Sequence, residues 1–512
     1  MNLYQAKPSL LLIDQSERAA GAPAGLPLLP AYYVRDQASR STTVLNAETF
    51  KLLEMLIEPT PYSVFSSHYA EEELKEIMRI LHEHELIQVD APTKNYARLL
   101  RAPEDPRLTG IPLVPRTIMI NCTPKCNLLC KHCIVSDKHH QQREVLRFEE
   151  LSIFLNDIDE HGLDNLVLSG GEPLLWQSIA KVLEDSLNRS YTVILYTNGM
   201  LINDKWLGIF KKIESLKPGG LQLHVSLDGG TPGTHDEIRG VKGSFQRIVT
   251  SLERLQQAGI PVASVESMAT RELYEELDSL ISICERYSIK SLYLHPVFNF
   301  DQDSRIQELE LDYDFRIRFL KRIQDMSQSG YSVDVRYSDP YFPAGLFKKE
   351  SARSRKEAEL FLKSILSGDK NKINQFSINR QQPETLMNCD GGTSQMFVDY
   401  TGAVYPCMIY ANSGKDDDYC GNVKDHTLLE IWNSQGMNRA RKVITREELS
   451  VCSGCEHFDH CGPTVKKCRI GSEIALNDFY GPSYLCVKYA DKLGISTQMV
   501  AAYEGLLGSF SR

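Results

Sequence analysis

From Thr117 to about Val297, the chain alternates short apolar runs with stretches of helical periodicity. The apolar runs are Thr117–Asn121, Asn165–Ser169, Thr192–Tyr196, Leu221–Leu227, Val262–Met268 and Ser291–Pro296. Between them apolar residues recur at helical spacing, as Ile248, Leu252 and Leu255 do before Gly259. Six β/α units in a row predict a parallel sheet, either a partial barrel or a doubly wound sheet. In both architectures a ligand binds at the carboxyl ends of the strands.

The rest of the chain divides around this block. Residues 1–110 combine β-branched or aromatic runs at 32–34, 42–45 and 86–89 with helical periods after Asn46 and at Leu74. We expect a small α+β domain and a linker there. Residues 111–310 then hold the β/α units, residues 311–385 form a charged helical bridging region, and residues 386–512 form a small domain rich in cysteine and glycine.

Charge and hydropathy exclude several function classes. A formal net charge of -10 disfavours generic binding to nucleic acid, which needs a concentrated basic surface. No apolar run is long enough to span a bilayer, and the apolar patch at residues 10–13 lacks the flanks of an export signal. We therefore expect a cytoplasmic protein with neither a membrane nor a nucleic-acid partner. In that reducing compartment, thirteen cysteines favour metal ligation over disulfides.

The cysteines fall into two groups, from Cys122 to Cys133 and from Cys389 to Cys486, with Cys284 alone between them. In the first group Cys126, Cys130 and Cys133 form a C-x3-C-x2-C pattern on the loop after the first strand. Three thiolates can hold three irons of a 4Fe–4S cluster and leave the fourth iron open. A zinc site would need four protein ligands, and loop cysteines without metal are the other alternative. Cys122 does not fit the spacing and is interpreted as a small buried hydrophobe, and Cys284 as structural.

This loop resembles the signature of the radical S-adenosylmethionine family, including a ring-bearing residue, His132, before the third cysteine. Further segments resemble family motifs in the family's order: Ser169–Pro173 the GGEP motif, then Tyr196–Gly199, Val225–Gly229 and His235–Gly240. The resemblance covers roughly residues 116–300. The chain departs from many relatives after Thr270, where Arg271-Glu272 replaces an asparagine. The resemblance implies a partial (β/α)6 barrel and an enzyme that cleaves S-adenosylmethionine to a 5′-deoxyadenosyl radical.

The resemblance also assigns the residues that bind S-adenosylmethionine. They are Gly170, Gly171, Glu172, Pro173, Asn198, Ser226, Asp228 and Arg239. The GGEP loop binds the methionyl amino group in the family, Ser226 and Asp228 resemble residues that contact the ribose, and Arg239 could pair with the carboxylate. A structural role as turn or cap residue is the alternative for Thr197, Asn198 and Arg239. The sequence identifies no catalytic acid or base.

The second cysteine group resembles the SPASM domain, which binds two auxiliary 4Fe–4S clusters in relatives. The resemblance assigns Cys452, Cys455, Cys461 and Cys486 to the distal cluster and Cys389, Cys407 and Cys468 to the nearer one. Cys420 is the predicted fourth ligand of the nearer cluster, with a loop thiol that binds no metal as the alternative. The spacing of six residues before Cys468 departs from the usual three, and a zinc ribbon is the competing interpretation. In total the sequence predicts three 4Fe–4S clusters, one of them with an open site.

The N-terminal α+β domain is similar to the winged-helix-like leader-peptide recognition element of ribosomal-peptide maturases. Such domains add the leader peptide as an extra strand at a sheet edge. A DNA-binding winged helix is the alternative, which the glutamates on and near the second helix disfavour.

Together these resemblances predict an enzyme that abstracts hydrogen from a ribosomally made precursor peptide and installs a cross-link, with a cysteine thioether as the first choice. The alternatives are aromatic C–C or C–O cross-linking and sulfatase-type oxidation of Cys or Ser to formylglycine. A non-catalytic electron-transfer protein is disfavoured by the intact cysteine triad and GGEP motif. The expected partners are the precursor, bound through its leader, and an electron donor such as flavodoxin or ferredoxin.

Overall fold

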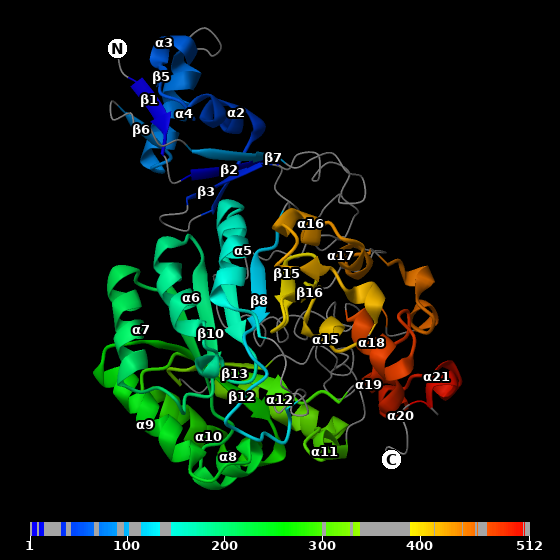
Figure 1. Cartoon of the computed structure of the whole chain (residues 1–512). Helices are drawn as coiled ribbons and strands as arrows, with labels where there is room; N and C mark the ends of the chain where they lie inside the picture. Colours follow the sequence, from blue (N-terminus) through cyan, green and yellow to red (C-terminus); the bar gives the residue numbers. More distant parts are fainter. Residues whose placement is uncertain are drawn as a thin grey trace.

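The computed structural model describes residues 3–7, 10–14, 32–36, 42–65, 71–89, 97–101, 114–133, 145–299, 304–327, 331–337, 390–413, 415–442, 444–455, 458, 468–504 and 506. An N-terminal unit, a central α/β body and a C-terminal unit beside that body make up the molecule (Figure 1). Of the expected bridging region, α12 (Tyr313–Ser327) and β14 (Asp334–Tyr337) are described, following α11 (Ser304–Gln307). Residues 338–385 lie outside the described residues.

The described residues of the N-terminal unit form two small sheets, with strand orders β4–β3–β2–β7 and β5–β1–β6, and three helices. The strands are β1 (Leu3–Ala6), β2 (Leu10–Asp14), β3 (Tyr32–Asp36), β4 (Thr42–Leu45), β5 (Thr60–Pro61), β6 (Ile87–Val89) and β7 (Arg98–Arg101). The helices are α2 (Ala47–Met55), α3 (Tyr62–Phe65) and α4 (Glu71–Glu83). The Asn46 side chain caps α2 by accepting a hydrogen bond from Thr49 N at 2.7 Å. The expected strands and helices are present, and β1, β2, β5 and β7 are additional.

The central sheet is parallel, as the alternation predicted. Its strands are β8 (Thr117–Asn121), β9 (Asn165–Ser169), β10 (Thr192–Thr197), β11 (Leu221–Ser226), β12 (Val262–Ala269), β13 (Ser291–Pro296) and β14. Each strand pairs with the next one along the chain. A doubly wound sheet would reverse this order at a switch point, whereas a sequential order places every connection on one face, as in a barrel wall. β14 continues the parallel order beyond the six predicted strands.

Amphipathic helices cover the outer face of this sheet (Figure 1). They are α5 (Phe148–Glu160), α6 (Ile179–Asp185), α7 (Asp204–Leu216), α8 (Pro232–Arg239), α9 (Ser244–Gln257) and α10 (Arg271–Arg286). Alternate strand residues such as Leu223 and Val225 are buried against the helices, while Gln222 and His224 alternate with them on the opposite face. Cys284 is fully buried on α10, as its structural interpretation requires.

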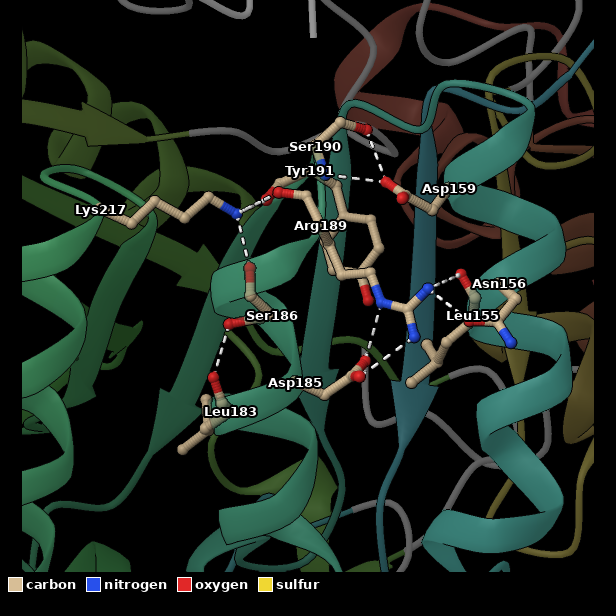
Figure 2. Close-up of polar contacts among 10 residues, drawn as sticks. All are labelled: Leu155, Asn156, Asp159, Leu183, Asp185, Ser186, Arg189, Ser190, Tyr191 and Lys217. Carbon is tan, nitrogen blue, oxygen red and sulfur yellow. Dashed lines mark hydrogen bonds and ion pairs between the residues drawn. The ribbon is translucent and has the colours of Figure 1, made fainter. Parts of the chain in front are cut away.

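A polar network braces the amino end of β10 against three helices (Figure 2). Lys217 Nζ donates to the backbone carbonyls of Ser186, Arg189 and Tyr191 at 2.7, 2.6 and 2.9 Å. The Arg189 guanidinium pairs with Asp185 at 2.8 Å, and Asp159 accepts hydrogen bonds from Ser190 N and Oγ. This network lies at the end of the sheet opposite the predicted ligand site, where it contributes to stability.

The C-terminal unit is joined to the barrel wall by a strand. β15 (Gln395–Val398) pairs in parallel with β8, and β16 (Ala403–Tyr405) and β17 (Gly421–Asn422) follow antiparallel. The helices are α15 (Met408–Ala411), α16 (Leu428–Trp432), α17 (Gln435–Ala440), α18 (Arg469–Leu476), α19 (Tyr484–Lys488), α20 (Ala490–Leu493) and α21 (Thr497–Glu504). Trp432 and its neighbours share one apolar core with β8 to β10, and Leu485 shares a second with α10 and α12.

Candidate functional site

The loop that follows β8 carries the first three predicted cluster ligands, and the Gly-rich loop after β9 holds it in place. Gly171 N donates to Thr123 O at 2.8 Å, and Glu172 N donates to Lys125 O at 2.8 Å. Gly170 has a φ of +132°, and a Cβ on Gly171 would overlap with Lys125 O. Both positions therefore need glycine, because the backbones of the two loops are in direct contact.

The Glu172 carboxylate ties this Gly-rich loop to the end of β10. The side chain is fully buried and accepts hydrogen bonds from Leu174 N at 3.0 Å, Thr197 Oγ1 at 2.8 Å and Asn198 N at 2.8 Å. Burial raises the pKa of Glu172, although these hydrogen bonds act in the opposite direction. The Asn198 side chain in turn donates to Asn127 Oδ1, on the cysteine loop, at 2.7 Å. Glu172 thus orders two loops that the sequence assigned to cofactor binding.

Asp228 and Arg239 lie against each other beside the cysteine loop. Asp228 Oδ2 is 2.6 Å from Arg239 Nε, and both side chains are nearly inaccessible to solvent. Burial opposes ionisation of Asp228, but the guanidinium holds its pKa below the usual range. Arg239 Nη1 also lies 3.6 Å from Cys130 Sγ. The positive charge is therefore shared between the Asp228 carboxylate and the predicted cluster site.

Two histidines complete this buried group. His132 Nε2 is 3.9 Å from Asp228 Oδ2, and His235 Nδ1 accepts a hydrogen bond from Asp228 N at 3.0 Å. Burial lowers the pKa of each histidine to about 4, so both are neutral at pH 7. Ser226, the last residue of β11, is half-buried two positions before Asp228.

The donor set of the loop suits an iron–sulfur cluster. Cys126, Cys130 and Cys133 are half-buried thiols that form no disulfide. Burial raises the pKa of Cys126 to about 11 and also raises that of Cys130. Thiolates at these positions therefore need a nearby cation. Arg239 already supplies one positive charge. The described residues contain no group of three or more His, Cys, Asp and Glu side chains placed for a single metal ion. In a 4Fe–4S cluster each thiolate binds a different iron, and the soft sulfur donors fit that group. Cys122 is buried in the apolar core, where burial raises the pKa of its thiol, as its interpretation requires.

The predicted C-terminal ligands occupy different surroundings. Cys407 and Cys468 both pack against the small apolar cluster of Tyr410, Ala440 and Ile470. Cys452 and Cys455 flank one short turn, and Cys486 lies on α19. Cys389 and Cys461 lie outside the described residues.

Cys420 is buried in the core that the C-terminal unit shares with the barrel. Its thiol donates to Asp418 O at 3.4 Å, and burial raises its pKa to about 12. Metal ligation would therefore have to supply the free energy of forming a thiolate at this position. The assignment of Cys420 to the nearer cluster stays a prediction.

A polar cluster on the inner face of the sheet escaped the sequence analysis. Glu266 contacts both His224 and His295, and the three side chains come from three neighbouring strands. They belong to no motif. The signal that could have revealed them is the presence of ionisable residues at alternate positions inside apolar strands, where each must face a partner or a ligand.

Comparison with known families agrees with this geometry. Residues 120–283 match the family model of the radical SAM superfamily, and residues 389–456 match that of the SPASM iron–sulfur cluster-binding domain. These matches define the class of the protein: it is a radical S-adenosylmethionine enzyme with a C-terminal SPASM domain.

Individual relatives are distant. The AdoMet-dependent heme synthase of Methanosarcina barkeri is 25% identical over 379 residues, which are 73% of this chain and 96% of the relative. The mycofactocin maturase MftC of Mycolicibacterium smegmatis is 22% identical, over 72% of this chain and 81% of MftC. The crystal structure of Streptococcus suis SuiB bound to precursor peptide SuiA has a TM-score of 0.63 and 13% identity, and covers 94% of this chain and 98% of SuiB. This likeness establishes a common fold. Among the described residues, no helix has the length and apolarity needed to cross a membrane.

Proposed function

We propose that this enzyme abstracts hydrogen from a ribosomally made precursor peptide and installs a cross-link, with a cysteine thioether as the first choice. The observation that carries the proposal is the N-terminal unit, in which β4, immediately before α2, is an edge strand of its sheet among the strands that the structure describes. An open sheet edge can take up a peptide as a further strand. The fold shared with SuiB, whose structure contains a precursor peptide, supports the same interpretation.

Within this proposal, Cys126, Cys130 and Cys133 hold a cluster with an open site. Gly170, Gly171, Glu172, Pro173, Asn198, Ser226, Asp228 and Arg239 bind S-adenosylmethionine. When bound, the cluster and S-adenosylmethionine supply the 5′-deoxyadenosyl radical that removes the hydrogen atom. Glu172 orders the binding loops, and Arg239 offsets negative charge at Cys130. The SPASM cysteines hold two auxiliary clusters, which brings the number of 4Fe–4S clusters to three. A flavodoxin or ferredoxin in the cytoplasm supplies the electron for the cleavage of S-adenosylmethionine.

A second candidate function is a step of heme synthesis, because the heme synthase of M. barkeri aligns over nearly its whole length. That alignment covers less of this chain than the alignment with SuiB does. Aromatic cross-linking and oxidation of Cys or Ser to formylglycine remain alternatives among peptide products.

The test is mass spectrometry of a short Cys-rich precursor peptide that is co-expressed with the enzyme. We expect each new cross-link to remove two hydrogen atoms, and fragmentation to place a thioether at a cysteine. The matched control replaces Cys126, Cys130 and Cys133 together with alanine. This variant should leave the precursor unmodified and release no 5′-deoxyadenosine, while the C-terminal cysteines still bind iron. An unmodified precursor with the loaded wild-type enzyme would contradict the proposal.

A further inference from the structure

The inner face of the barrel wall carries an ionisable cluster that has no role in the proposed binding of S-adenosylmethionine. His224 on β11, Glu266 on β12 and His295 on β13 belong to it. Their sequence neighbours Val225, Val265 and Leu294 are buried in the apolar core with α9 and α10. Successive side chains of a strand point to opposite faces, so the three polar side chains lie on the face away from the helices.

Glu266 joins the two imidazoles. Its Oε2 accepts a hydrogen bond from His295 Nε2 at 2.5 Å, and its Oε1 accepts hydrogen bonds from His224 Nδ1 at 2.8 Å and from Ser264 Oγ at 2.5 Å. Burial alone would raise the pKa of Glu266, but these hydrogen bonds and the histidines lower it to about 2. The carboxylate is therefore ionised at neutral pH, and each imidazole carries a proton on the nitrogen that faces it.

Among the described residues, the other groups around the cluster are neutral or already paired. The Tyr196 ring on β10 lies 4.7 Å from the His224 ring, and the Tyr293 ring lies 6.4 Å from it on the other side. Burial raises the pKa of both tyrosines, so they stay protonated. On β14, Arg336 donates to the Tyr293 hydroxyl at 2.6 Å and pairs with Asp334 at 2.5 Å. Glu266 thus has the two imidazoles as its ionisable partners.

His295 is the exposed member of the cluster. Its side chain is 46% exposed, against 8% for Glu266 and 12% for His224. Because Nε2 faces the carboxylate, Nδ1 is the nitrogen that can take up a proton. An accessible imidazole held from behind by a buried carboxylate is the arrangement of a general base.

The position of His295 is also suited to chemistry on a bound substrate. His295 is paired in register with Met268 on β12. Met268 N donates to Asp228 Oδ1 at 2.8 Å, and Asp228 is one of the residues proposed to bind S-adenosylmethionine. The base on β13 and the proposed cofactor site after β11 therefore lie at the same end of the sheet, on either side of β12.

We infer that His295 accepts a proton from the peptide group that becomes bonded to the substrate radical, and that Glu266 is its positioning residue. The inference rests on the proposed function and names a residue for it. For a thioether, the 5′-deoxyadenosyl radical takes one hydrogen atom from the peptide carbon, and the cysteine thiol gives its proton to His295 Nδ1. The carbon–sulfur bond then forms, and the surplus electron passes to an iron–sulfur cluster. The peptide loses one hydrogen atom, one proton and one electron, which balances the removal of two hydrogens.

The test compares wild type with His295→Ala, His295→Gln and Glu266→Gln, using a precursor deuterated at the carbon that is attacked. We expect all variants to transfer deuterium to 5′-deoxyadenosine, while the ratio of cross-link to 5′-deoxyadenosine falls roughly 10²-fold in both His295 variants at pH 7. Added imidazole should restore part of the ratio in His295→Ala, and so should a pH above the ordinary pKa of a thiol, about 8.5. Glu266→Gln should lower the ratio less.

Precursor affinity separates this role from a structural one. The affinity of the His295→Gln variant for the precursor, measured by fluorescence anisotropy without reductant, should stay within about twofold of the wild-type affinity. The reason is that glutamine can still donate a hydrogen bond to Glu266. An unchanged cross-link ratio in the His295 variants, with an active wild type, would overturn the inference and leave the proposed function standing. So would a reduced ratio that imidazole and pH do not restore. A wild-type enzyme that leaves the peptide unmodified overturns both.

Discussion

Two buried carboxylates organise the candidate site at the scale of single residues. Glu172 accepts backbone hydrogen bonds from two loops, and Asp228 binds both Arg239 and the backbone of Met268. Each carboxylate therefore fixes a relation between segments that the sequence keeps far apart. Removing one would leave several buried donors without an acceptor, which costs more than the loss of one hydrogen bond.

Cys420 gives the sharpest prediction for a single residue. If it is the fourth ligand of the nearer cluster, Cys420→Ala should bind less iron than wild type and change the electron paramagnetic resonance signal of the auxiliary clusters. Cys284→Ala is the matched control, because Cys284 is also a buried thiol whose pKa burial raises to about 12. Anaerobic iron analysis of both variants provides the measurement. Unchanged iron and an unchanged signal in Cys420→Ala would mean that this thiol only packs beside Gly436 and donates to Asp418 O.

The motif residues were predictable one by one because their chemistry is local. A C-x3-C-x2-C loop or a Gly-Gly-Glu turn is specified by neighbours in sequence, and the structure places these loops in contact. The pairing of Asp228 with Arg239 and the Glu266 cluster were not predictable. They depend on which strands are adjacent and on the register between them. The alternation of side chains along a strand shows which residues share a face, but it does not show which residues of the next strand lie beside them.

At the scale of elements, Lys217 at the end of α7 stands out because one ammonium group binds three carbonyls (Figure 2). Lys217→Met keeps the apolar stem and leaves these acceptors without their charged donor. We expect the free energy of unfolding to fall by about 2 kcal/mol, measured by urea denaturation. Lys212→Met is the control on the same helix, since its exposed pair with Glu184 is long, at 3.4 Å. Equal free energies of unfolding in the two variants would mean that the hydrogen bonds of Lys217 do not stabilise the fold.

The strands of the central sheet were predictable to within a residue or so because each is a buried apolar run. β14 was not, because Asp334-Val-Arg-Tyr is short and half charged. Within the described part of the chain, Arg336 binds Asp334 of the same strand and the Tyr293 hydroxyl. β2 shows in the sequence only as an apolar patch, since its partners β3 and β7 lie far along the chain. Non-local pairing, rather than local propensity, decides these elements.

At the scale of the whole molecule, the three units are connected by shared apolar cores. Leu11 and Ile13 of β2 pack into the same core as β8, and the C-terminal unit adds Trp432 to that core. The hydrogen bond from Leu428 N to Asp157 Oδ2, at 2.6 Å, joins α16 to α5. Removal of the N-terminal unit would expose part of the barrel core, so point substitutions at its surface test peptide binding more cleanly than truncation does.

The edge strand β4 is where such a substitution belongs. Val44 is 64% exposed on this strand, although valine favours burial. If the leader adds a strand here, Val44→Asp should weaken precursor affinity roughly tenfold, because about 1.5 kcal/mol of apolar burial is lost. Fluorescence anisotropy with a labelled precursor measures this. Val64→Asp on α3 is the matched control, since Val64 is 40% exposed away from that edge. Both variants should release 5′-deoxyadenosine from S-adenosylmethionine as wild type does in the absence of peptide. Equal affinities of the two variants would mean that the precursor binds elsewhere on the enzyme.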